Sequence, residues 1–119
     1  MPLVVVKHKA GRMLDDMLAD LADALTEIVA DALHTPENKG GELSPNDIEV
    51  WVQESGKHDI DTKDLEIIIW ANEYPNRLAN LVDRKDRIVR AMRKFLADYD
   101  RNLSGFVWVL LQPAAYGEF

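Results

Sequence analysis

The residue of this sequence best placed to do chemistry is Pro2, which stands between Met1 and the apolar run at residues 3–6. Proline lacks a backbone N–H and is tolerated best at the first position of a strand, which is one explanation for its place. The other explanation is chemical: removal of Met1 would turn the Pro2 nitrogen into a secondary amine. An α-amino group has an ordinary pKa of about 8, and apolar surroundings lower it. A neutral amine near pH 7 can act as a general base beside a carbonyl group.

Two arginines are candidates for binding a substrate carboxylate, because the planar guanidinium can hold both carboxylate oxygens. Arg77 follows the turn NEYPN, whose proline and asparagine suit the start of a helix, a place that favours anions. Arg12 follows Gly11 after the first apolar run. Ten extended residues span about 33 Å, so Arg12 would have to serve the Pro2 of a neighbouring subunit. The alternative for both arginines is a solvated position at a helix start, with Arg77 paired to Glu73.

Aromatic side chains could supply the apolar walls that a neutral amine requires. The candidates are Tyr74, Tyr116 and Phe119. The three histidines show no metal-ligand spacing such as HxxxH, so we expect no metal site. The sequence also contains no GxGxxG or GxxxxGK motif, and we expect no cofactor.

The composition limits the class of protein. The chain has 119 residues, 47% of them apolar, which predicts one domain with a modest core. Acidic residues outnumber Lys and Arg by 21 to 14, giving a net charge of −7, which argues against nucleic acid or an anionic membrane as the main partner. The absence of cysteine excludes disulfides and thiolate chemistry. Without an apolar run of membrane-spanning length or a signal-peptide pattern, a cytoplasmic location is the default expectation.

Apolar spacing predicts four strands and two amphipathic helices. The strands are expected at 3–6, 48–52, 65–71 and 106–111, and the helices at 13–33 and 77–99. The halves 1–55 and 64–119 share this strand–helix–strand order and the letters VWV, which indicates an internal repeat. Because a β-α-β unit makes its strands parallel, we expect a single α+β domain over residues 1–119, a two-layer fold with a four-stranded mixed sheet and both helices on one face. A ferredoxin-like antiparallel sheet, usually dimeric, is an alternative.

The opening segment PLVVVKHKAGR, followed by a helix, resembles the tautomerase superfamily, of which the 4-oxalocrotonate tautomerase family is one branch. Short members begin with a catalytic proline, and long members carry two β-α-β units and form trimers. The segment YGEF near the C-terminus is similar to an aromatic-glycine turn of that superfamily. The resemblance implies that Pro2 is catalytic, that Arg77 lies where long members place substrate-binding arginines, and that Arg12 matches the Gly-Arg of short members. The strand IEVWV departs from the pattern, since short members often carry an arginine there.

Three functional hypotheses follow. The first is a cofactor-independent tautomerase or isomerase acting on a small 2-oxo or enol carboxylate, with Pro2 as the general base. The second is a catalytically silent trimer that binds or supports other molecules, and the third is the ferredoxin-like module. A homotrimer is expected for the first two, because two helices cover only one face of an apolar sheet and another copy must cover the other.

Overall fold

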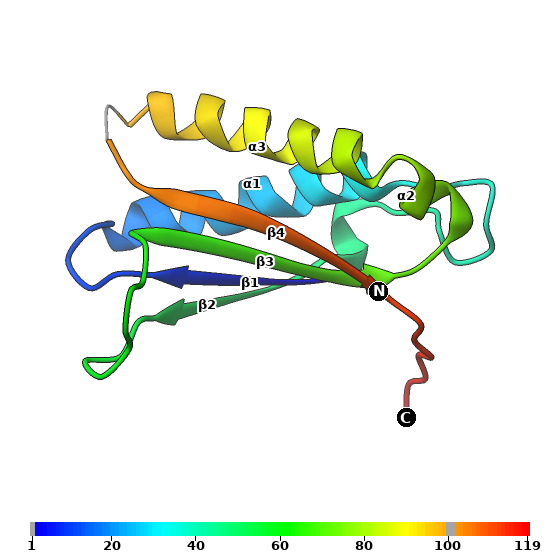
Figure 1. The fold of residues 1–119 in the computed structure, drawn as a ribbon, viewed down its shortest axis with the longest axis horizontal. Coiled ribbons are helices and arrows are strands. Elements are labelled where there is room, and N and C mark those ends of the chain that lie inside the picture. The colour runs from blue at the N-terminus through cyan, green and yellow to red at the C-terminus, as the bar shows by residue number, and fades with distance from the viewer. Residues whose placement is uncertain (1, 100–101) are drawn as a thin grey trace.

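The computed structural model describes residues 2–99 and 102–119. Its centre is a sheet with the strand order β2-β1-β3-β4 (Figure 1). The strands are β1 (Leu3–His8), β2 (Glu49–Glu54), β3 (Leu65–Asn72) and β4 (Gly105–Gln112). β1 pairs in parallel with β2, β3 pairs in parallel with β4, and β1 and β3 are antiparallel. The predicted mixed sheet is confirmed, and the antiparallel ferredoxin-like alternative is wrong.

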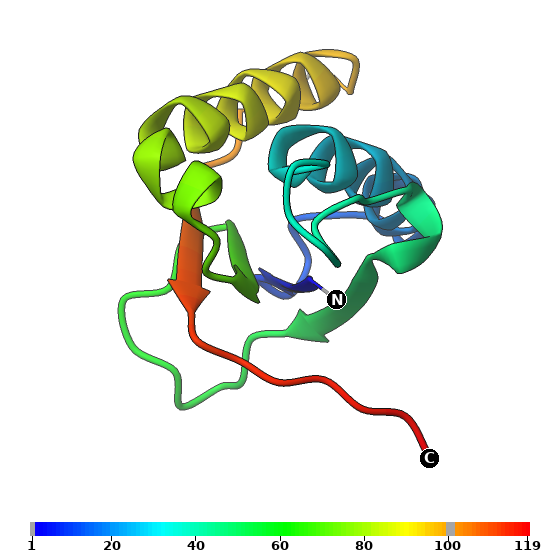
Figure 2. The ribbon, with the colours of Figure 1, turned by 90° about the vertical axis from the view of Figure 1, so that its right-hand side faces the viewer.

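The helices all lie on one face of this sheet (Figure 2). They are α1 (Asp15–Leu33), α2 (Pro75–Ala79) and α3 (Leu81–Ala97), and a short 3-10 turn, Pro45–Asp47, precedes β2. The single helix expected at 77–99 is therefore wrong at its start, because the chain breaks at Asn80, which has φ −125° and ψ 34°. The Asn80 side chain accepts a hydrogen bond from Arg84 at 2.6 Å. Asparagine favours such helix ends, since its amide competes with the backbone for hydrogen bonds.

The core forms between the helices and the facing side of the sheet. Alternate residues of the central strands point to this side, so that Val4, Val6, Ile67 and Ile69 are almost completely buried. They pack against the apolar faces of α1 and α3. The opposite face of the sheet is open in the single chain and includes Trp51, Trp70 and Trp108, of which Trp108 is 57% exposed.

The strand directions divide the candidate residues between two ends of the sheet. Because β1 and β3 are antiparallel, Pro2 lies at the end where β3 leads into α2. β4 ends there too, as the Glu73 N–H donates to the Gln112 carbonyl at 3.0 Å. The turn that carries Arg12 lies at the opposite end, one six-residue strand away. Among the described residues, no helix has the length and apolar character needed to cross a membrane.

Candidate active site

Pro2 is buried at the head of β1. Its carbonyl accepts a hydrogen bond from the Glu49 N–H at 3.2 Å, which anchors it beside β2. The β1–β3 register pairs Leu3 with Trp70, so its continuation places Pro2 opposite Ala71. Ala71 is buried among the core residues, and strand alternation directs Pro2 to the same helix-facing side as Val4. The Pro2 ring therefore lies in the apolar setting that a neutral amine needs.

Arg77 lies at the same end of the sheet and is 2% exposed. Its Nε donates to the Leu33 carbonyl at 2.9 Å, and its Nη1 donates to the Asn72 carbonyl at 3.0 Å. The guanidinium also stacks over the Tyr74 ring, with its carbon 4.8 Å from the ring centroid. Burial lowers the pKa of Arg77 from its ordinary value. The alternative that Arg77 is a solvated residue at a helix start is wrong. Its long side chain extends from α2 to the end of α1 and is buried there.

Part of the Arg77 guanidinium has no partner within the described residues. Nη2 is buried and makes no hydrogen bond there. Neither of the two described acceptors is charged, since both are backbone carbonyls. An unpaired buried donor is costly in free energy, and an anionic oxygen would satisfy it.

Arg84 is a second buried arginine, which the sequence analysis did not single out. It is 8% exposed. Its Nη1 donates to the carbonyls of Ala32 and His34, each at 3.1 Å. A signal was present, because Arg84 falls at helical spacing within the apolar stripe of Leu81, Ile88 and Met92.

Together Arg77 and Arg84 satisfy three successive carbonyls at the C-terminus of α1. The last carbonyls of a helix have no partner within it, and they form the negative end of the helix dipole. The helix dipole favours the two buried cations at this place, and the negative charge of Glu37 acts on Arg84 in the same direction. Burial also lowers the pKa of Arg84.

The predicted aromatic walls fall into two groups. Tyr74 is partly buried beside Arg77, and its hydroxyl donates to the Lys39 carbonyl at 3.2 Å. Tyr116 and Phe119 are exposed in the tail that follows β4 (Figure 2). The tail leaves the sheet at the Pro2 end, but the single chain does not bury these two rings. Their role as walls stays a prediction.

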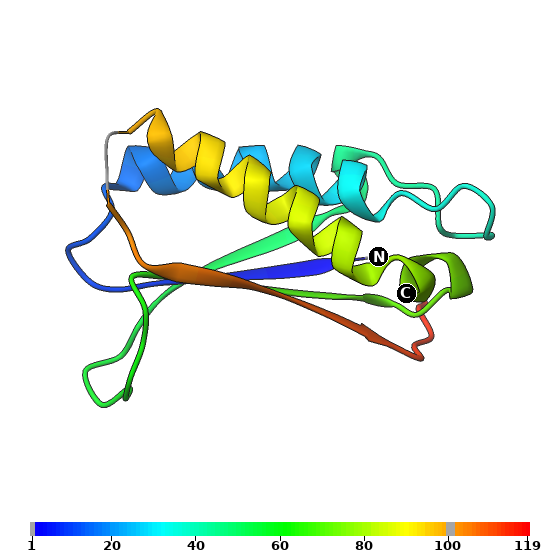
Figure 3. The same cartoon turned by 45° about the horizontal axis from the view of Figure 1, so that its top comes forward.

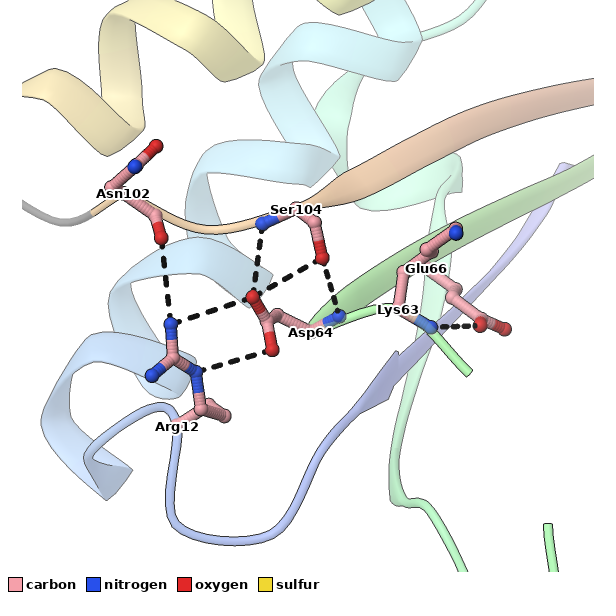
Figure 4. Close-up of polar contacts among 6 residues, drawn as sticks. All are labelled: Arg12, Lys63, Asp64, Glu66, Asn102 and Ser104. Carbon is pink, nitrogen blue, oxygen red and sulfur yellow. Dashed lines mark hydrogen bonds and ion pairs between the residues drawn. The ribbon is translucent and has the colours of Figure 1, made fainter. Parts of the chain in front are cut away.

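Arg12 lies at the opposite end of the sheet in a structural cluster (Figure 4). Its Nε is 3.1 Å from Asp64 Oδ1, and its Nη2 donates to the Asn102 carbonyl at 3.4 Å. Asp64 also accepts from the Ser104 N–H at 3.0 Å and from its hydroxyl at 3.2 Å. The Ser104 N–H is the main cause that lowers the pKa of Asp64, and Arg12 adds to it. The cluster ties together the connections that precede α1, β3 and β4.

β1 separates Arg12 from its own Pro2, but by less than ten extended residues would, because the strand ends at His8. Six residues of strand span about 20 Å. Arg12 is also held by Asp64 in its own chain. A role for Arg12 at a neighbouring subunit's site stays a prediction.

The histidines are dispersed over the structure. His34 follows α1, and its Nδ1 accepts a hydrogen bond from the Leu43 N–H at 3.0 Å. His8 ends β1, where its Nδ1 is buried without a partner among the described residues. Within residues 2–99 and 102–119, no group of three His, Asp or Glu side chains is arranged to hold a metal ion.

Known structures share this fold, whereas no family model and no curated protein matches the sequence. The chain is similar to 5-carboxymethyl-2-hydroxymuconate delta-isomerase, with a TM-score of 0.67 and 13% identity over 100% of this chain and 88% of that chain. It is similar to malonate semialdehyde decarboxylase, with a TM-score of 0.62 and 15% identity over 98% and 91%. A fused 4-OT asymmetric trimer gives a TM-score of 0.63 and 17% identity over 93% and 86%. The chain therefore shares its fold with these three proteins, and this is the two-layer fold expected from the sequence.

Proposed function

We propose that the chain, once Met1 has been removed, is a cofactor-independent tautomerase or isomerase that acts on a 2-oxo or enol carboxylate. Pro2 is the general base in this proposal. The observation that supports it most is the position of Pro2, which is buried at the apolar, helix-facing head of a central strand. The fold is shared with a delta-isomerase and a decarboxylase.

The proposed reaction moves one proton. The neutral Pro2 amine takes a proton from the carbon next to the substrate carbonyl, and the resulting ammonium returns it to another atom of the enolate. Two features of the site favour the neutral amine as the resting form. Apolar surroundings disfavour its charged form, and the cations Arg77 and Arg84 at the same end of the sheet disfavour a further positive charge.

Arg77 is the proposed partner of the substrate carboxylate. Its Nη2 is the guanidinium nitrogen that lacks a described acceptor, and the bonds to Leu33 and Asn72 fix the orientation of the group. A fixed donor adds directional binding at little further cost in side-chain entropy. Tyr74, Tyr116 and Phe119 are the proposed walls. Arg12 of a neighbouring subunit is the second candidate for the carboxylate.

The proposed assembly is a homotrimer. The open face of the sheet includes the apolar residues Leu3, Val5, Ile68 and Trp70 around a shallow groove, and exposed apolar surface of this kind marks an interface. One protein of the same fold, the fused 4-OT, is a trimer. Sedimentation at micromolar concentration should give a mass of three chains, and a stable monomer would exclude the assembly.

The test compares two forms of the same protein. Material that keeps Met1 has an amide nitrogen at Pro2, which cannot act as a base, whereas material that has lost Met1 has the amine. After separation and confirmation by intact mass, both forms are assayed with enolised phenylpyruvate and 2-hydroxymuconate, alongside Pro2→Ala. We expect turnover in the Met1-free native form alone. Equal turnover in all three forms would exclude Pro2 as the base.

A further inference from the structure

The helical layer carries an unusual separation of charge, which is independent of the proposed reaction. α1 has six acidic residues and no basic residue. α3 has six basic and two acidic residues within a chain of net charge −7. The two helices lie side by side and form the outer layer of the molecule, with the sheet behind them (Figure 3).

The charges follow the outward side of each helix. The acids Asp16, Asp20, Asp23 and Glu27 recur at spacings of four, three and four residues, and all are exposed. This spacing places them on one helical face. On α3 the exposed bases are Arg87, Arg90, Arg93 and Lys94, and the buried Arg84 lies on the inner side.

Two contacts between α1 and the α3 segment show which residues of the two helices lie beside each other. Arg87 Nη2 lies 2.6 Å from Asp31 Oδ2 near the end of α1 and the start of α3. Tyr99 donates its hydroxyl hydrogen to Asp20 Oδ2 at 2.6 Å near the other end. The helices are therefore antiparallel. Asp23 and Glu27 lie between these two levels, as do Arg90 and Lys94.

The charges are partly compensated within the chain, but the observed compensation is limited. Among the described residues, Arg87–Asp31 is the ion pair that joins α1 to α3. Asp23, Glu27, Arg90 and Lys94 form no ion pair within the described part of the chain. Asp83 is exposed at the start of α3, but between the levels of the two contacts each helix presents charges of one sign to solvent.

We propose that this layer is an interaction surface for a second copy of the same chain. A two-fold axis parallel to the helices places α1 of one copy over α3 of the other, and the reverse pair forms at the same time. A rotation about this axis does not change the position of a residue along the helix direction. The acids Asp23 and Glu27 therefore meet Arg90 and Lys94 of the other copy, whereas a perpendicular axis would place α1 on α1.

The size of the layer indicates a weak and salt-dependent association. Helices of 19 and 17 residues are about 25–30 Å long and about 10 Å wide, which gives a face of roughly 500 Å² per copy. Stable interfaces bury about 800 Å² per partner. Salt screens exposed charges over about 10 Å at 0.1 M and about 3 Å at 1 M, so the association should weaken steeply in this range.

The experiment uses two variants of opposite charge. Asp23→Lys with Glu27→Lys makes the middle part of α1 positive like that of α3, and Arg90→Glu with Lys94→Glu reverses two of the three exposed bases in the middle part of α3, so that it carries net negative charge like that of α1. Neither variant should associate with itself through this layer at low salt, whatever assembly its sheet face forms. Mixed in equal amounts they should associate, because each positive helix meets a negative one in the other copy. Compensation within one chain cannot produce this rescue between chains.

Sedimentation velocity at about 100 μM in roughly 20 mM and 500 mM NaCl is the measurement, and circular dichroism checks that each variant is folded. The native chain should form a larger species at low salt, with at least tenfold weaker association at high salt. The control is Glu42→Lys with Glu54→Lys, at exposed positions away from the layer. It changes the net charge by as much as Asp23→Lys with Glu27→Lys does, and it should associate like the native chain. The proposal would be overturned if the native chain sedimented with the same mass at both salt concentrations. It would also be overturned if the equal mixture of the two charge variants formed no larger species at low salt.

Discussion

The two ends of the sheet differ in how they hold their arginines. At the Pro2 end, Arg77 and Arg84 are buried and donate only to neutral oxygen atoms of the described residues. At the opposite end, Arg12 is about half exposed and pairs with the carboxylate of Asp64. Arg12 is thus neutralised by a direct ion pair within the chain, whereas Arg77 and Arg84 form no direct ion pair among the described residues, and Glu37 acts on Arg84 only at longer range. This difference is the reason for proposing that an anionic substrate binds at the Pro2 end.

The largest effect on stability is expected from Arg84→Met. The change removes donors to the Ala32 and His34 carbonyls and to the Asn80 amide, and it leaves those acceptors without a partner. Hydrogen bonds to a charged group contribute about 1.5–3 kcal/mol, so the free energy of unfolding should fall by about 2–4 kcal/mol. Denaturant unfolding measures the loss. Arg90→Met, at an exposed position of the same helix, is the control and should change stability by less than about 0.5 kcal/mol; equal stability of both variants would contradict the structural role of Arg84.

A smaller effect, seen in activity, is expected from Arg77→Lys. Lysine keeps the charge but loses the planar group that the Leu33 and Asn72 carbonyls orient. For a carboxylate substrate kcat/KM should fall about tenfold, which corresponds to about 1.4 kcal/mol. The substrate's amide or ester is the control, because loss of the carboxylate contact should leave its already low kcat/KM almost unchanged.

A general loss of structure in Arg77→Lys would lower the rates with both substrates alike. Asn76→Ala changes an exposed residue of the same helix and should leave both rates unchanged. Full activity of both Arg77→Lys and Arg77→Ala would mean that another residue binds the substrate carboxylate. Arg12 of a neighbouring subunit would then be the next candidate.

The smallest effect is expected from Arg12→Ala. Exposed ion pairs contribute about 0–1 kcal/mol, so thermal unfolding should shift only slightly and turnover should stay within about twofold. Because the pKa of Asp64 is lowered in the folded state, its contribution to stability is present above the ordinary carboxyl pKa of about 4 and is lost as the pH falls through the lowered value. The native chain and Arg12→Ala should therefore converge in stability on acidification. A tenfold fall in kcat/KM would instead assign Arg12 to a neighbouring active site.

Much of the fold was predictable because it depends on local apolar spacing. The four strands and α1 lie within about two residues of their expected bounds, and the strand–helix–strand order led to the mixed sheet. The break at Asn80 was missed because the apolar spacing continues across it. The 3-10 turn at Pro45–Asp47 was also missed, although Ser44 and Asp47 form a recognisable capping box.

The candidate site was less predictable than the fold. Pro2 at the head of an apolar strand was evident from its neighbours in the sequence. The burial of Arg77 and Arg84 depends on where the last carbonyls of α1 meet α2 and α3, contacts that join residues 44 to 52 positions apart. Periodicity alone assigns arginines to the surface, and only the tertiary structure provides the acceptors that allow them to be buried.

The pKa of the Pro2 amine tests the central claim most directly. Met1-free protein with ¹⁵N-labelled proline can be titrated by NMR, and the Pro2 nitrogen followed from pH 5 to 10. Apolar surroundings and two nearby cations should lower this pKa below the ordinary α-amino value of about 8, and kcat/KM should rise with pH through the same value as the amine loses its proton. A pKa at or above about 8, with kcat/KM independent of it, would contradict Pro2 as the general base.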